Sequence, residues 1–207
     1  GPGELDQSAR MGTGTGGAWF NVTSLAVPHV SGAAALAKQA HPGWCAIEIK
    51  ALLLNPANPM LHKNGTVYPE SLAGAGFLDV AQAVNTTVTA QAEDSKGLTT
   101  LSLGTLALVK PWDETRQIRV TNHSDSEVKF DLSVEETVTA TGFDIALPVH
   151  KVTIAAKSNK LVPVRFSAHP PPFDRPAHPL PPPQPHDRAT TRADTIRAPT
   201  ASTLAAR

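Results

Sequence analysis

Two hydroxyl residues, Thr23 and Ser24, stand at the start of an apolar run that continues to residue 40. Small hydroxyl residues before such a run predict a helix N-terminus, and the segment 41–43, His-Pro-Gly, predicts the end of the helix. Alanine, glycine and serine crowd the run, so the helix can pack closely against other elements on nearly all sides. We therefore expect a buried central helix over 23–40, with more protein around it than this chain supplies.

The position of Ser24 has two interpretations. At a helix N-terminus, unpaired backbone N–H groups and the positive end of the helix dipole stabilise negative charge. A nucleophilic serine needs this environment, because an oxyanion develops beside it during acyl transfer. The simpler interpretation is that Thr23 or Ser24 only caps the helix, since serine and threonine are preferred cap residues.

The residues around Ser24 favour the nucleophile. The segment 22–32 reads Val-Thr-Ser-Leu-Ala-Val-Pro-His-Val-Ser-Gly and resembles the serine-nucleophile motif of the subtilisin-like serine proteases, usually written GTSMAxPHVxG. The matching positions are Thr23, Ser24, Ala26, Pro28, His29, Val30 and Gly32. Shorter matches follow in the family's order at 33–36, 41–44, 49–53 and 74–80. The resemblance thus covers roughly the first eighty residues and implies the C-terminal part of a subtilisin-like α/β domain.

Two positions of the motif differ from the family. Leu25 replaces methionine, which is a mild apolar exchange, and Val22 replaces glycine. A β-branched residue at position 22 would be strained if its φ were positive. Pro28 is expected within about the first turn, where a missing N–H costs little. His29 is too close to Ser24 on the same helix to act as its base, and the resemblance implies a packing role for it.

The resemblance also implies a function. A serine protease needs a nucleophile, a base, a carboxylate that orients the base, and an oxyanion hole. In the subtilisin-like order the Asp and the His precede the Ser, so both are expected upstream of Gly1, as is the oxyanion-hole Asn, because Asn21 is too close. We expect a serine-type endopeptidase that hydrolyses peptide bonds through an acyl-enzyme on Ser24, with this chain inactive alone. The alternative is a degenerate, non-catalytic relative that acts as a binding or structural module.

A second helix is predicted over 44–57. The family usually has Ser-Pro at its start, where this chain has Cys45-Ala46 and so loses a favourable cap. Pro56 should end the helix early. Cys45 is the single cysteine, which excludes an internal disulfide. No basic residue flanks Cys45 closely, so we expect a buried or half-buried structural thiol rather than a reactive one.

From residue 98 the hydrophobic period changes to alternation. Short runs of alternating apolar residues, the first at 101–108, are separated by turn signals at 110–111, 122–125, 141–142 and 157–159. This pattern predicts an antiparallel β-sandwich over 97–168, which resembles the fibronectin type III-like domain of many large subtilases. The expected organisation is a C-terminal portion of a peptidase domain (1–90), this sandwich, and a disordered Pro-rich tail (169–207).

Composition excludes several other classes. The 18 basic and 18 acidic residues cancel, so nothing favours nucleic acid or an anionic membrane as partner. No apolar run approaches the ~20 residues of a membrane span. The Gly-Thr segment 12–17 reads as a flexible turn rather than a phosphate cradle, and we expect no cofactor and no metal. The resemblance implies a protein or peptide substrate and a secreted or cell-surface location; no signal peptide opens the chain, and the oligomeric state stays open.

Overall fold

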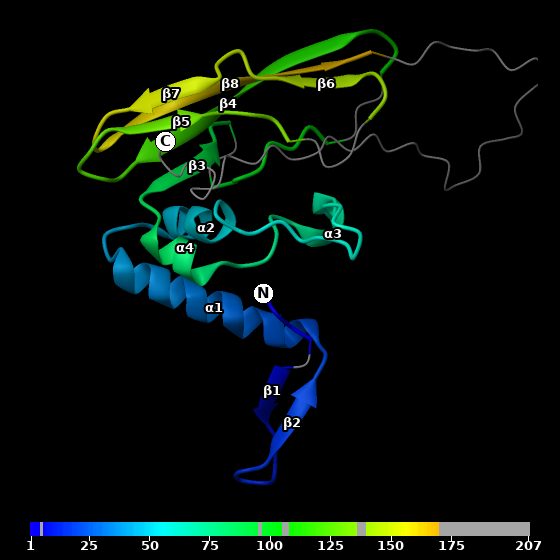
Figure 1. Ribbon diagram of the computed structural model, residues 1–207, viewed down its shortest axis with the longest axis vertical. Coiled ribbons are helices and arrows are strands. Elements are labelled where there is room, and N and C mark those ends of the chain that lie inside the picture. Colours follow the sequence, from blue (N-terminus) through cyan, green and yellow to red (C-terminus); the bar gives the residue numbers. More distant parts are fainter. Residues whose placement is uncertain (5, 95–96, 105–107, 136–139, 170–207) are drawn as a thin grey trace, which may run out of the picture.

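The computed structural model describes residues 1–4, 6–94, 97–104, 108–135 and 140–169. The tail predicted for 169–207 lies outside these residues, apart from His169. Helices and antiparallel sheets both occur, as expected. Figure 1 shows them in succession: a hairpin, a long helix, a layer of shorter helices, and then the β-sheets.

The first element is a hairpin of β1 (Asp6–Ala9) and β2 (Gly17–Phe20), which pair antiparallel. Its Gly-Thr connection forms the predicted turn, where Gly12 has a φ of 78°, a conformation that glycine adopts without a side-chain clash. The short apolar piece 18–20 lies in β2. Residues 1–10 show no hydrophobic periodicity, so the sequence does not indicate β1, whose order comes from its pairing with β2.

Four helices follow in the described residues: α1 (Thr23–Ala40), α2 (Ala46–Leu54), α3 (Glu70–Ala73) and α4 (Val80–Asn85). α1 has the predicted bounds, and α2 stops at Leu54, before Pro56, as expected. α4 begins with an N-cap: Asp79 accepts a 2.9 Å hydrogen bond from the backbone N–H of Gln82. This bond is the main reason that the pKa of Asp79 is lowered.

The strands of the second half form two antiparallel sheets. One has the order β3 (Val88–Ala92), β4 (Trp112–Asn122), β8 (Ser158–Ala168) and β6 (Phe143–Ala146), and the other pairs β5 (Val128–Asp131) with β7 (Lys151–Ile154). The predicted strand at 101–108 is not formed at 101–104, and 105–107 lie outside the described residues. β6 was missed, since four residues carry too little alternation to be read.

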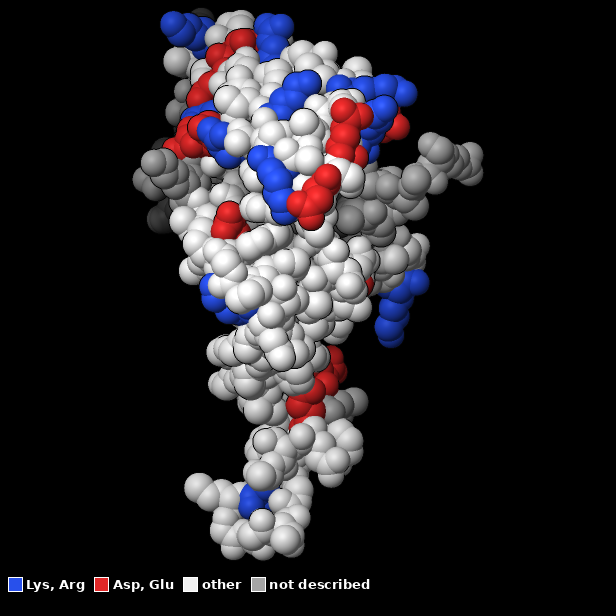
Figure 2. All heavy atoms as spheres, turned by 90° about the vertical axis from the view of Figure 1, so that its left-hand side faces the viewer, with Lys and Arg blue, Asp and Glu red and all other residues white. Residues whose placement is uncertain are grey.

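The two halves of the molecule have different surfaces. Figure 2 shows acidic and basic side chains gathered over the sheets, whereas much of the surface below them is uncharged. Ion pairs lie across neighbouring strands, including Arg165 with Asp113 at 2.6 Å and Arg119 with Glu93 at 2.6 Å. α1 instead exposes apolar side chains: Val27 is 62% exposed and Leu36 is 50% exposed.

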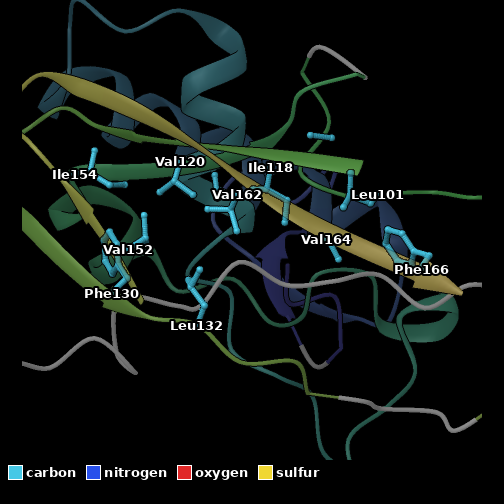
Figure 3. Packing of buried hydrophobic residues seen from close by; sticks show 12 residues of the cluster. Leu101, Ile118, Val120, Phe130, Leu132, Val152, Ile154, Val162, Val164 and Phe166 are labelled. Carbon is cyan, nitrogen blue, oxygen red and sulfur yellow. The ribbon is translucent and has the colours of Figure 1, made fainter. Parts of the chain in front are cut away.

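The largest core lies between the two sheets (Figure 3). Its buried residues are Ala90, Ala92, Leu101, Ile118, Val120, Phe130, Leu132, Val152, Ile154, Val162, Val164 and Phe166. Smaller clusters join α1 to α2 and α4 through Ala33, Ala37 and Leu52. Only Ala33 and Ala37 of α1 are buried by the described residues. The buried central helix was expected with more protein around it than this chain supplies, so that expectation stays a prediction.

Candidate active site

Ser24 is the second residue of α1, at the helix end where backbone N–H groups lack intrahelical partners. The side chain is exposed. Val22 holds the N-cap position, in which no side chain makes a capping hydrogen bond. Capping by Thr23 or Ser24, the simpler of the two interpretations, is therefore not what the structure has. The hydroxyl of Ser24 stands beside the positive end of the helix dipole, where a developing negative charge is stabilised.

Val22 adopts an ordinary extended conformation, with φ −146° and ψ 144°. β-branched residues occupy this region without strain. The penalty expected for a positive φ at the family's glycine position therefore does not arise. Valine at position 22 leaves the backbone beside Ser24 unstrained.

The first three residues of the chain hold the start of α1. The backbone N–H of Val22 donates to the carbonyl of Gly3 at 2.9 Å. Gly1 lies so close to the helix that a Cβ added to it would stand 2.7 Å from the carbonyl oxygen of Ala26. A side chain at Gly1 would thus require the backbone to move, which explains glycine at this contact.

Two residues of the motif shape the helix behind Ser24. Pro28 is the sixth residue of α1, deeper than the first turn in which it was expected. Because proline has no N–H, the helical hydrogen bond to the carbonyl of Ser24 is missing. Nδ1 of His29 donates to the carbonyl of Leu25 at 2.8 Å. This bond holds the imidazole along its own helix, in agreement with the prediction that His29 is not the base.

No base for Ser24 is found within the part of the chain that the structure describes. None of these residues forms a hydrogen bond to the Ser24 hydroxyl, and no imidazole–carboxylate pair stands beside it. Asp6, on the neighbouring β1, has one carboxylate oxygen, Oδ2, enclosed without a hydrogen-bond partner. Among the described residues, the arrangement therefore provides an exposed serine hydroxyl beside helix-terminal amides, but no base hydrogen-bonded to that hydroxyl.

Cys45 corrects two expectations. The thiol is exposed rather than buried. It also caps α2 in a capping box: the Glu48 side chain accepts from the Cys45 backbone N–H at 2.7 Å, and the thiol accepts from the backbone N–H of Glu48. The helix start thus keeps a cap despite the loss of Ser-Pro. The spacing Cys-x-x-Glu, which parallels Ser-x-x-Glu, is the signal that could have indicated it.

Other kinds of site are not evident in the described residues. No group of three His, Cys, Asp or Glu side chains among them is placed to hold a metal ion. No helix among them is long and apolar enough to cross a membrane. Ser24 is thus the one site residue that the sequence predicts, and the hydrogen bonds that would complete a catalytic group around it are not formed by the described residues.

Comparison with known proteins supports a family for the first half of the chain. Residues 7–103 match the model of the Subtilase family. This match supports the relationship of residues 7–103 to the subtilase family. It includes the β1–β2 hairpin, all of α1 with Ser24, and the chain through β3.

Several relatives agree with this assignment. The Minor extracellular protease Vpr of Bacillus subtilis (strain 168) is 30% identical over 146 residues, which are 66% of this chain and 17% of Vpr. The Subtilisin-like protease SBT1.6 of Arabidopsis thaliana is 38% identical over 77 residues, or 32% of this chain and 10% of that protein. Subtilisin BL of Lederbergia lenta is 43% identical over 56 residues, or 25% of this chain and 21% of that protein.

The chain spans about a fifth or less of the length of each of these relatives. The similarity to Vpr extends over 146 residues, more than the 97 residues of the segment 7–103. The similarity to Vpr must therefore extend beyond residue 103, into the strands that follow β3.

Proposed function

We propose that Ser24 is the nucleophile of a subtilisin-like serine endopeptidase. Ser24 lies in the matched segment, is exposed at the second residue of α1, and is not used as the helix cap. In the proposed reaction the Ser24 oxygen attacks the carbonyl carbon of a peptide bond, a base takes the hydroxyl proton, and the amine leaves with a proton. Water then releases the acyl group from Ser24.

The substrate class follows from the same proposal. Peptide-bond hydrolysis requires a protein or peptide substrate, and the balanced charge of the chain gives no reason to add nucleic acid. Vpr is named as an extracellular protease, which favours a secreted or cell-surface location for this chain. We further propose that 97–168 form a fibronectin type III-like β-sandwich that follows a peptidase portion over 1–90, with a Pro-rich tail over 169–207.

We also propose that the catalytic Asp and His, and the Asn of the oxyanion hole, come from polypeptide other than the described residues. A serine without its base loses most of its catalytic advantage. The chain of 207 residues should then be inactive by itself. The degenerate, non-catalytic relative is the second candidate, because the described residues make no hydrogen bond to the Ser24 hydroxyl.

Labelling with a fluorophosphonate serine-hydrolase probe tests the proposal. The samples are this chain, the longest natural chain that contains it, and Ser24→Ala in both. Ser31→Ala is the matched control, because Ser31 lies on α1 but donates its hydroxyl to the carbonyl of Val27 at 3.0 Å. We expect labelling of the long chain alone, lost in Ser24→Ala and kept in Ser31→Ala.

Each of the other outcomes overturns part of this proposal. Labelling of the 207-residue chain that disappears in Ser24→Ala would contradict its inactivity when alone. Labelling of the long chain that survives Ser24→Ala would place the nucleophile elsewhere. No labelling of any sample would favour the degenerate relative, with the β-sheet region as its working part.

A further inference from the structure

Three aromatic rings are stacked where the helices meet the sheets. The Trp44 ring lies 4.3 Å from the His41 ring and 3.9 Å from the His123 ring, measured between ring centroids, with interplanar angles of 24° and 34°. His41 and Trp44 come from the connection between α1 and α2, whereas His123 follows the last residue of β4. The stack therefore joins residues about eighty positions apart in the sequence, from the two halves of the molecule.

Both imidazoles are fixed by hydrogen bonds to their surroundings. Nε2 of His41 donates to the carbonyl of Val84, at the end of α4, at 2.9 Å. Nε2 of His123 lies 3.1 Å from the hydroxyl oxygen of Thr89 on β3. Both imidazole rings beside Trp44 are thus held in place, and the stack touches α4, β3 and the turn after β4.

A second contact lies along the same junction. The side-chain amide of Asn55 pairs with the backbone of Ala90 on β3: the Ala90 N–H donates to Oδ1 at 2.9 Å, and Nδ2 donates to the Ala90 carbonyl at 3.2 Å. β3 is an edge strand of its sheet, so Asn55 occupies backbone groups that a neighbouring strand would otherwise pair. The junction thus consists of one ring stack and one amide pair.

Charged side chains from several elements lie near His123. The Nζ atom of Lys157, in the turn between β7 and β8, donates to the carbonyl of His123 at 2.8 Å and pairs with Asp125 at 3.0 Å. Burial is the main cause that lowers the pKa of His123; Glu48 on α2 opposes it, while His41 and Lys157 add to it. A proton on His123 would therefore stand partly out of water and near two basic groups.

We propose that the His41–Trp44–His123 stack is an acid-sensitive joint. It holds the β-sheet region (β3–β8) against the helices α1, α2 and α4 at neutral pH and loosens when His123 is protonated. This inference rests on the position of His123, half-buried between the Trp44 ring, the Thr89 hydroxyl and the Lys157 ammonium group, and does not depend on the chemistry of Ser24. Attraction between a cation and the face of Trp44 works in the opposite direction. The pH midpoint of the His123 titration shows whether burial and the basic neighbours outweigh the attraction to the Trp44 ring.

The direction of the pH effect follows from linkage. A histidine whose pKa in the folded protein lies below its ordinary value of 6.5 stabilises the fold fully above pH 6.5. As the pH falls below that value, the unfolded chain binds the proton first, and the stabilisation is lost progressively until the folded form also titrates. The joint should hold at neutral pH and weaken in acid.

Fluorescence of Trp44 tests the joint in the full chain. Trp19→Phe and Trp112→Phe together leave Trp44 as the single tryptophan, and its emission is followed from pH 8 to pH 4.5. A protonated imidazole in contact with indole quenches its emission, so we expect a step with a midpoint below 6.5. Every sample also carries His41→Phe, so that His123 is the one imidazole in ring contact with Trp44 among the described residues. The step should then remain in His41→Phe and disappear when His123→Phe, which keeps a ring in the stack but cannot bind a proton, is added.

His62→Phe is the matched control, because His62 stacks on Tyr68 with ring centroids 3.5 Å apart, outside this joint. It should leave the step unchanged. The thermal midpoint of unfolding should also fall further in acid in the wild type than in His123→Phe. A step that persists when both His41 and His123 are replaced by Phe, a midpoint at or above 6.5, or equal acid sensitivity of the wild type and His123→Phe would overturn the proposal.

Discussion

The β-sheet region and the helical region of this chain bury very different amounts of apolar surface. The sheets enclose a cluster of 12 residues that includes the fully buried Val164 and Phe166. α1, with 18 residues, buries only Ala33 and Ala37 and exposes Val27 and Leu36. Since burial of apolar surface is the main force for folding, the sheets can supply their own stability, whereas the helices depend on neighbours.

The difference has a consequence for the site. Ser24 lies on the element with the smaller core, at the end of α1 that points away from the sheets (Figure 1). The geometry around Ser24 therefore depends on local features, namely the helix start, Pro28 and the contact between Val22 and Gly3. The contrast between the two regions is open to measurement by substitution.

The largest effect is expected in the sheet core. Phe166→Ala removes a ring that is 0% exposed and leaves a cavity, so the free energy of unfolding should fall by about 3–5 kcal/mol. Urea unfolding followed by far-UV circular dichroism measures it. Leu161→Ala, at an exposed position of the same strand β8, is the control and should change it by less than about 0.5 kcal/mol. Equal effects of the two would show that the sheets have no specific core.

A smaller effect is expected at the junction of the two regions. Asn55→Ala removes both hydrogen bonds to Ala90 and leaves the buried Ala90 backbone without them, at a cost of about 1–2 kcal/mol. The loss should appear as separate unfolding of the two regions, seen as two transitions in calorimetry. Asn85→Ala, which removes an exposed bond within α4, is the control. A single unchanged transition in Asn55→Ala would show that the amide pair does not couple the regions.

The smallest effect is expected on the outer face of α1. Leu36→Ala shortens a side chain that is half exposed, so the free energy of unfolding should change by no more than about 0.5 kcal/mol. The same substitution at the fully buried Leu52 of α2 should cost about 2–5 kcal/mol and serves as the comparison. A loss of 2 kcal/mol or more in Leu36→Ala would mean that this face of α1 is packed against other protein.

Local signals explain what could be predicted. The bounds of α1 followed from the hydroxyl pair before an apolar run and from the His-Pro-Gly stop, and α2 ended before Pro56. Errors arose where two local preferences competed. Cys45 was expected to be buried because free cysteines usually are, but the Glu three residues later makes it an exposed helix cap.

The sequence did not indicate which polar residues are buried. Asn122 was predicted only as part of a turn, yet its side chain is fully buried. Its Nδ2 donates to the carbonyls of Ser126 at 2.8 Å and Ala155 at 3.0 Å, and its Oδ1 accepts from Ser124. The bond to Ala155 joins two turns 33 residues apart, and no local pattern could have signalled it.

The sequence by itself determined where Ser24 stands, because the start of the apolar run and its His-Pro-Gly stop act within one helix. Only the tertiary structure decided which groups meet across the junction: Trp44 with His123, and Asn55 with Ala90. Such pairs are selected when separate elements pack together and must satisfy one another's buried polar groups. That selection depends on the whole arrangement in space, so no short segment of the chain contains it.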